Sequence, residues 1–171
     1  MKDPVSKGSQ LLNDLYELTF SGNINELAIQ RIVREAEKIK FEDPLNYYYI
    51  MGAVSCVRND EEGMHKYYQK ALEQFGNYAL TRFNYAVSLH RLGYLSEAKD
   101  QARKACVLAS TTEKYQEFYE RVHFELTNKQ MWSEMEKESE DVFNQDFLYA
   151  SESALAKTWD DPEEDEAWAD L

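Results

Sequence analysis

Two stretches of the chain repeat each other and decide its fold: YYYIMGAVSCVRNDEEGMHKYYQKALEQF (residues 47–75) and TRFNYAVSLHRLGYLSEAKDQARKACVLA (residues 81–109). They align at an offset of 34 residues, which places Ala71 over Ala105. In the second copy, apolar residues recur every three or four positions on both sides of Gly93, the spacing of one helix face. A glycine at that place favours a helix end and a turn. Each copy therefore predicts two helices joined by a turn.

Small residues stand where the two helices of each copy would cross closely. A larger side chain at such a crossing would force the helices apart, so small residues there indicate tight packing. The positions concerned are Gly52, Ala71, Ala86, Ala98 and Ala105.

The second copy resembles the tetratricopeptide repeat, a helix–turn–helix unit of 34 residues. The residues that carry this resemblance are Asn84-Tyr85-Ala86, Leu92-Gly93-Tyr94-Leu95, Glu97-Ala98 and Ala105. The first copy departs from the family at its turn, where Asn59-Asp60 stands for Leu-Gly, and neither copy has the closing proline. The resemblance covers residues 45–110. It implies stacked hairpins whose first helices line a groove that binds peptides.

The residues before the repeat continue the helical pattern more loosely. Apolar residues recur at helical spacing through residues 11–18 and again through 27–39, with Gly22-Asn23 as a turn between them. Asp43 then precedes Pro44, which is the arrangement of a capping residue followed by proline at the first helical position. These features predict one more hairpin and the start of the next helix.

After the repeat, apolar residues from Tyr115 to Leu126 and from Met131 to Met135 predict a further pair of helices broken at Asn128. The sequence thus predicts an all-α fold of about four stacked antiparallel helical hairpins, a tetratricopeptide-like superhelix, with an acidic C-terminal tail. We assign residues 1–145 to the helical repeat domain and residues 146–171 to the tail. A helical bundle without solenoid curvature is the alternative architecture.

The charge of the chain is concentrated near its C-terminal end. The net charge is −13, and residues 128–171 contain three bases and fourteen acids. Phosphate and anionic lipid attract basic surfaces, so neither nucleic acid nor membrane is expected as a partner. No apolar run is long enough to span a membrane, and the first residues lack the apolar segment of a signal peptide. A cytoplasmic protein is therefore expected.

Motifs for catalysis or metal binding are not found in the sequence. His65, His90 and His123 have no ligand partner at helical or turn spacing. Cys56 and Cys106 lie fifty residues apart, and in a reducing compartment we expect them to be buried as small apolar residues. There is no glycine-rich phosphate loop and no Gly-x-Ser-x-Gly elbow. The sequence predicts no enzyme, no cofactor and no metal site.

The tetratricopeptide resemblance implies which residues would face a bound peptide. Core packing is the alternative role for the apolar members of this set. The partner-binding groove residues implied by the resemblance are Asn46, Tyr49, Phe83, Val87, His90, Arg91, Lys114 and Arg121.

The acidic tail combines tryptophans with a dense run of acids. Leu155 and Trp159 lie four residues apart, on one face of a predicted short helix, and Asp161-Pro162 predicts the start of a second one. Trp168 and Leu171 form the apolar side of that second helix. Helices this short need a surface to lie on. We expect the tail to dock on its own last hairpin, on the groove of the same or a neighbouring copy, or on a basic partner.

The segment SALAKTWDDPEEDEAWADL (residues 153–171) is similar to the C-terminal segments of some bacterial type II antitoxins. Those segments end in Leu-Ala-x-x-Trp followed by Pro-Glu-Glu-Asp and an aromatic residue, and they lie over basic toxin surfaces. No DNA-binding arm accompanies the segment, which departs from the antitoxin pattern. Three functions follow: a non-catalytic tetratricopeptide-like scaffold that binds a protein or peptide, an antitoxin-like inhibitor of a basic toxin, or a chaperone of the type III secretion kind.

Overall fold

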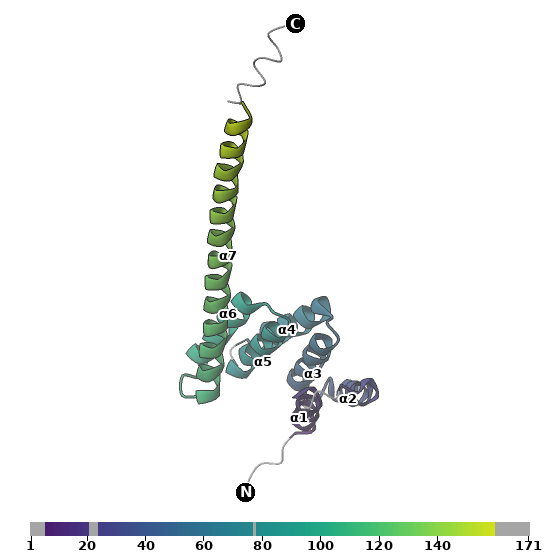
Figure 1. Ribbon diagram of the computed structural model, residues 1–171. Helices are drawn as coiled ribbons and strands as arrows, with labels where there is room; N and C mark the ends of the chain where they lie inside the picture. The colour runs from purple at the N-terminus through teal and green to yellow at the C-terminus, as the bar shows by residue number, and fades with distance from the viewer. Residues whose placement is uncertain (1–5, 21–23, 77, 160–171) are drawn as a thin grey trace, which may run out of the picture. The chain divides into compact units, whose positions relative to one another are not determined.

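The computed structural model describes residues 6–20, 24–76 and 78–159, and within these residues the chain is helical with short connections (Figure 1). The described part contains seven helices and no strand, so the predicted all-α class is confirmed. The helices are α1 (Lys7–Phe20), α2 (Glu26–Ile39), α3 (Pro44–Val57), α4 (Glu61–Phe75), α5 (Ala79–Arg91), α6 (Leu95–Leu108) and α7 (Glu113–Trp159). The chain forms two compact units, residues 1–126 and 127–171, and each is described by itself.

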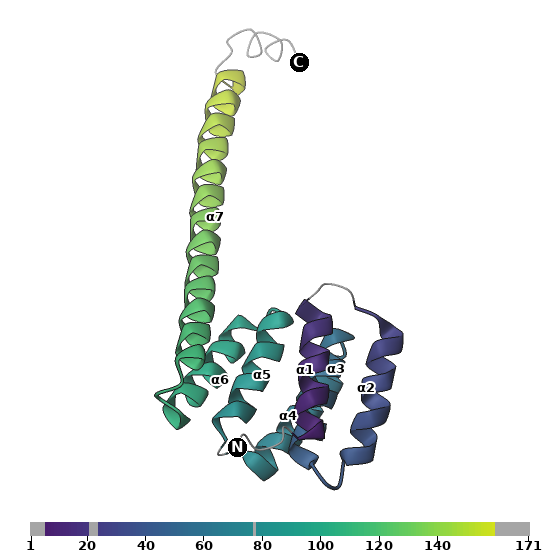
Figure 2. The same cartoon turned by 90° about the horizontal axis from the view of Figure 1, so that it is seen from below.

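Within the first unit, the helices pair in chain order into three hairpins. The pairs are α1 with α2, α3 with α4, and α5 with α6, and the last two pairs pack most extensively (Figure 2). Helix α3 also contacts α1, α2 and α5, while α4 contacts α5. The hairpins are therefore stacked side by side, and the two copies of the sequence repeat are the second and third of them.

Side-chain caps fix where several helices begin. The carboxylate of Asp43 accepts a hydrogen bond of 3.3 Å from the backbone N–H of Asn46, and Pro44 occupies the first position of α3, as the sequence predicts. Asp60 caps α4 in the same way, with a bond of 2.9 Å from the N–H of Gly63. Such caps satisfy backbone donors that have no partner inside the helix.

The turns of the two repeat copies have one geometry with different residues. Gly93 has a φ of 86°, and its N–H and that of Tyr94 donate to the carbonyls of His90 and Leu89. Asn59, which lies 34 residues earlier, has a φ of 55° and closes α3 with the equivalent pair of bonds. Asparagine is the residue other than glycine that most readily adopts this left-handed conformation. Asn59 therefore takes the place of the glycine of the second turn, and not that of its leucine as the sequence alignment had it, and the helix ending is unchanged.

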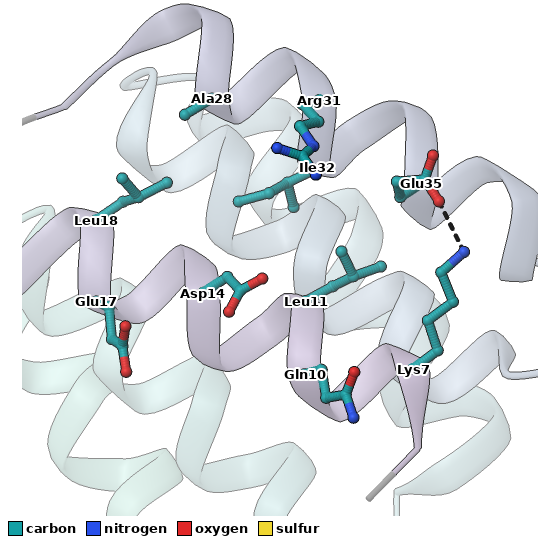
Figure 3. Close-up of a pocket in the computed structure, with 10 residues that line it drawn as sticks. All are labelled: Lys7, Gln10, Leu11, Asp14, Glu17, Leu18, Ala28, Arg31, Ile32 and Glu35. Carbon is teal, nitrogen blue, oxygen red and sulfur yellow. Dashed lines mark hydrogen bonds and ion pairs between the residues drawn. The ribbon is translucent and has the colours of Figure 1, made fainter.

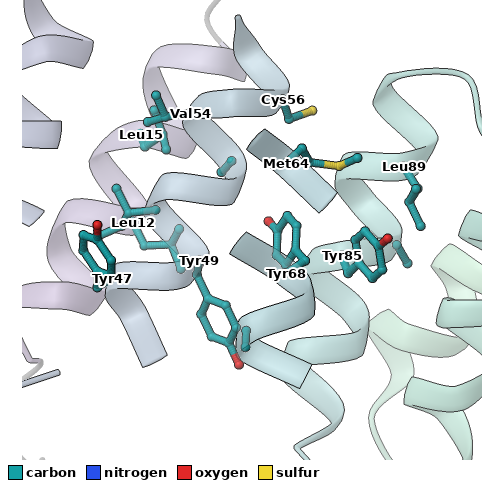
Figure 4. Packing of buried hydrophobic residues seen from close by; sticks show 14 of the residues in the cluster. Leu12, Leu15, Tyr47, Tyr49, Val54, Cys56, Met64, Tyr68, Tyr85 and Leu89 are labelled. Carbon is teal, nitrogen blue, oxygen red and sulfur yellow. The ribbon is translucent and has the colours of Figure 1, made fainter. Parts of the chain in front are cut away.

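The small residues at the predicted helix crossings are all buried, which confirms that prediction. At the crossing of α3 and α4, Gly52 faces the fully buried ring of Tyr68, which is shown among the core side chains in Figure 4. A Cβ atom added at Gly52 would lie 2.7 Å from that ring. Only glycine lets the two helices approach this closely without displacing the ring.

Buried hydroxyl groups connect one hairpin to the next. The hydroxyl of Tyr49 in α3 lies 2.7 Å from the Thr81 hydroxyl in α5. Ser88 in α5 donates a bond of 3.0 Å to the Tyr68 hydroxyl in α4. Because buried polar groups need partners, these pairs fix the position of the second hairpin against the third.

Helix α7 differs from the prediction for the last quarter of the chain. It runs without interruption from Glu113 to Trp159, so the predicted turn at Asn128 and the fourth hairpin are wrong. Asparagine costs only about 0.7 kcal/mol relative to alanine inside a helix, and no glycine or proline occurs between Gly93 and Pro162. The predicted boundary between residues 145 and 146 falls inside α7.

Candidate interaction surfaces

The N-terminal part of the predicted groove is occupied by packing contacts. Tyr49 is fully buried and hydrogen-bonded to Thr81, and burial raises the pKa of its hydroxyl to about 12. Asn46 is half-buried, and its side-chain amide donates a bond of 2.8 Å to Asp43. Tyr49 therefore offers no surface to a partner in this conformation, in keeping with the core-packing alternative for its role.

The C-terminal part of the predicted groove brings cations and aromatic rings together across α5 and the first turns of α7. The ammonium of Lys114 lies 5.0 Å from the ring centroid of Phe83, and Phe83 packs on Tyr115 with 4.7 Å between ring centroids. The guanidinium of Arg121 lies 5.1 Å from the Phe118 ring. Both cations are exposed, whereas Tyr115 and Phe118 are buried. The result is an aromatic layer covered by positive charge.

The remaining predicted groove residues lie further along α5. The Nε2 atom of His90 is 2.6 Å from a carboxylate oxygen of Glu125 in α7. Val87 is half-buried and Arg91 is exposed. The structure thus brings His90, Phe83, Lys114 and Arg121 to one α5–α7 surface, while Asn46 and Tyr49 lie on α3. Whether any of these residues binds a partner stays a prediction.

A cleft of about 850 Å³ lies between α1 and α2 (Figure 3). Lys7 and Glu35 form an ion pair of 2.7 Å across it. Hydrogen bonds from Lys38 and Lys7 lower the pKa of Glu35 to about 2. The apolar residues that line the cleft are Leu11, Leu18, Ala28 and Ile32. The cleft therefore joins an apolar lining to a rim of both charge signs.

A second cleft, of about 730 Å³, runs along α4 and reaches Tyr85 and Glu97. His65 lies in it, with its Nδ1 atom 2.6 Å from the Tyr85 hydroxyl. The other lining residues are charged or polar residues of α4, so no aliphatic residue lines this cleft. Neither cleft is lined by a predicted groove residue. Sequence reasoning missed both, because each is a product of helix packing and not of a motif.

Among the side chains that the structure describes, the largest set of exposed apolar ones on one helix face belongs to α7 in the second unit. Its five members are 48–70% exposed. At about 100° per residue they fall within an arc of about 120°, which is the width of a helix face that normally packs against another element. We call this set the α7 apolar face, and it consists of Met131, Trp132, Met135, Val142 and Phe143. Its first three members lie where the sequence predicts the second helix of a fourth hairpin, but the structure has one continuous helix there.

Acidic residues border the α7 apolar face on both sides. At helical spacing, one edge contains Glu134, Glu138 and Asp141, and the other contains Glu136 and Glu140. All five are exposed. Apolar positions flanked by charge at helical spacing were the signal that could have identified this surface from the sequence.

The predicted docking residues of the tail cannot be placed as side chains. Leu155 and Trp159 belong to α7, but their side chains lie outside the described part of the structure. Trp168 and Leu171 also lie outside the described residues. Their docking role stays a prediction.

Two further properties of the described residues bear on what the chain can bind. None of the described helices is long and apolar enough to cross a membrane. Within the same residues, no three histidine, cysteine, aspartate or glutamate side chains are grouped so that they could hold a metal ion.

In comparisons with known proteins, no family model and no curated protein matches this sequence.

Proposed function

We propose that this chain is a non-catalytic protein-interaction module in which a tetratricopeptide-like stack of hairpins carries a long helix that binds another protein. The observation that carries the proposal is the exposed α7 apolar face. The face consists of two groups of exposed apolar side chains with Ser139 between them. Large apolar side chains gathered on one helix face are costly to leave in water, and in folded proteins such a surface marks an interaction site. Trp132 is its largest member, and tryptophan is among the residues that most often dominate binding energy.

The predicted groove is the weaker of the two surfaces. Its aromatic rings on α5 and α7 are already packed on one another, and its exposed members are the cations Lys114, Arg121 and Arg91. Exposed charges without an apolar anchor contribute little to affinity. In this proposal the α5–α7 surface is a secondary contact, and the α7 apolar face supplies the anchor residues.

An antitoxin-like inhibitor and a secretion chaperone are special cases of the same activity, since both bind a protein partner in the cytoplasm. In the antitoxin-like case the acidic tail, residues 146–171, is the binding element, and residues 160–171 are the part of it that follows the last residue of α7. Removing these residues while keeping α7 separates the two possibilities. A partner that is retained by residues 1–159 binds through α7 or the hairpins and does not need residues 160–171.

The test is a pull-down from an extract of the source cells with three forms of the full chain. The first is the unchanged protein, and the second carries Met131→Ser, Met135→Ser and Val142→Ser. The third is a matched control with Gln130→Ser, Asn144→Ser and Leu148→Ser, which places three serines outside the face on the same helix. Proteins captured by the first and third forms but lost from the second support the proposal. Equal capture by all three forms would show that the α7 apolar face is not the binding site.

A further inference from the structure

A more specific inference rests on the proposed function and concerns the chemistry of the partner that binds the α7 apolar face. The α7 apolar face extends over Met131 to Phe143, a distance of about 18 Å along a helix that rises 1.5 Å per residue. Its apolar side chains recur at helical spacing on a surface that is itself a helix. A second amphipathic helix matches such a surface, because ridges of one helix fit into grooves of the other over several turns.

The charges beside the face decide what kind of helix fits. Five exposed carboxylates lie on its two edges, three on one side and two on the other. Residues 127–148 contain only two bases, Lys129 and Lys137. At about 100° per residue, Lys137 lies on the opposite side of the helix from the apolar face, and Lys129 lies on the edge of Glu136 and Glu140, two residues before the face begins. A helix docked on this face would therefore have its flanking positions beside negative charge along most of the contact.

A second copy of this chain is a poor occupant of the face for the same reason. Two α7 helices packed through their apolar faces would set acidic edges against acidic edges. Like charges at the flanking positions of paired helices are the usual means by which helices reject a wrong partner. Opposite charges at those positions select the right one and accelerate its association.

We propose that the α7 apolar face binds a basic amphipathic helix, with Met131, Trp132, Met135 and Val142 packed on the partner's apolar side chains and the edge acids beside its lysines or arginines. The apolar contacts supply affinity and the acids supply selectivity. Both contributions are needed, which separates this mode of binding from general attraction of cations to an acidic protein.

The probe is a synthetic helical peptide of about 21 residues, three heptads, with leucine at the core positions and lysine at the flanking positions. A second peptide has glutamate in place of each of those lysines. Binding of each labelled peptide to the full chain is followed by fluorescence anisotropy. At about 50 mM salt, where surface charges are weakly screened, we expect the lysine peptide to bind at least about thirtyfold tighter than the glutamate peptide. At about 500 mM salt this preference should shrink to a few-fold.

Two sets of variants test the two contributions separately. The substitutions Met131→Ser, Met135→Ser and Val142→Ser leave every charge in place. They should lower the affinity for the lysine peptide at least about tenfold. Unchanged binding by this variant would mean that the acids alone, including those of the tail, attract the peptide, and the proposal would be wrong. Circular dichroism of the variant checks that α7 remains helical.

The second set removes charge from one edge with Glu134→Gln, Glu138→Gln and Asp141→Asn. Its control carries Glu42→Gln, Glu73→Gln and Glu113→Gln, which change the net charge equally at exposed sites elsewhere. The edge variant should lose most of the preference for lysine, and the control should keep it. Equal preference in both would place the selectivity in the overall charge and overturn the inference.

The outcome also distinguishes this inference from the proposed function. If the pull-down depends on the α7 apolar face while the two peptides bind equally, the interaction module stands and the basic partner is wrong. A dimer in sedimentation equilibrium that dissociates on Met135→Ser would identify a second copy as the occupant and likewise overturn the inference.

Discussion

The substitution Gly52→Ala tests how tightly α3 and α4 pack where they cross in the core. The added Cβ atom would lie 2.7, 2.9 and 3.0 Å from three atoms of the Tyr68 ring, whereas carbon atoms in ordinary contact are about 3.5–4.0 Å apart. The ring must therefore move by nearly 1 Å. It is fully buried, stacked on Tyr85 with 5.1 Å between ring centroids, and hydrogen-bonded to Ser88, so it has no free direction in which to move.

The expected size of the effect follows from two opposing contributions. Overpacking a close-packed core costs about 1–3 kcal/mol. Replacing glycine by alanine within a helix gains about 1 kcal/mol. The net expectation is a loss of about 1 kcal/mol in the free energy of unfolding, measured by urea denaturation followed by circular dichroism.

The same substitution in a Tyr68→Leu background separates the steric cost of the added Cβ atom from the gain in helix propensity. In Tyr68→Leu the flat ring is gone, so the alanine at position 52 has room and only its gain in helix propensity remains. There Gly52→Ala should stabilise the protein, which gives a coupling free energy between the two positions of at least about 1 kcal/mol. Stabilisation of equal size in both backgrounds would show that the crossing is looser than described and would refute the reasoning.

Three further outcomes are expected. Gly93→Ala should lower the free energy of unfolding, measured by urea denaturation, by about 1 kcal/mol. The added Cβ atom would meet nothing within 4 Å, so the loss comes from the φ of 86°, which is strained for any L side chain. The Glu35 carboxylate should titrate by NMR with a pKa near 2, below its ordinary 4.5. Its ion pairs therefore stabilise the fold above about pH 4.5, and this stabilisation is lost as the pH falls toward 2. The substitution Lys38→Met should raise the pKa of Glu35. In Cys106→Ser, a thiol reagent should modify Cys56 only as fast as the protein opens, because the Cys56 side chain is buried and burial raises its pKa; modification at the rate of a free thiol would contradict that burial.

The repeat region was predictable from sequence because several local signals agree there. The 34-residue offset gives the pairing of helices, Asp43 with Pro44 gives the start of α3, and Gly93 gives the turn before α6. Each is a local property of the backbone or of its nearest side chains, so it can be recognised without knowing the rest of the fold. The small residues at the crossings add a tertiary signal that agrees with the local ones.

The course of α7 was not predictable in the same way. After Leu126 the apolar residues lie on a different face of the helix. Such a change is compatible with a turn between two helices and also with one helix that has two apolar faces. Asn128 is compatible with both, since it neither breaks a helix nor favours one strongly. The choice is made by the absence of glycine and proline in this part of the chain, a signal that is weak at any one residue.

The candidate sites were less predictable than the fold. A resemblance assigns positions to a groove by alignment, but the side chain of Tyr49 is buried by α3–α5 contacts that the alignment does not contain. The cleft between α1 and α2 depends on how far apart two helices pack, which a pattern of residues does not specify. The α7 apolar face was visible as a pattern and was misassigned because a partner helix within the chain was assumed.

The hydroxyl pairs between hairpins have a consequence for how this chain could be rebuilt. In an idealised repeat protein, one unit can be deleted, duplicated or exchanged because every junction is alike. Here the bonds belong to particular pairs of hairpins: Tyr16 of the first donates a bond of 3.2 Å to Asn84 of the third, while Tyr49 meets Thr81 and Ser88 donates to Tyr68 between the second and third. Removing or exchanging a hairpin would leave buried hydroxyl and amide groups of its neighbours without a hydrogen-bond partner. The three hairpins are therefore not interchangeable modules, and an engineer who wishes to lengthen the stack must copy each tyrosine together with its hydrogen-bond partner.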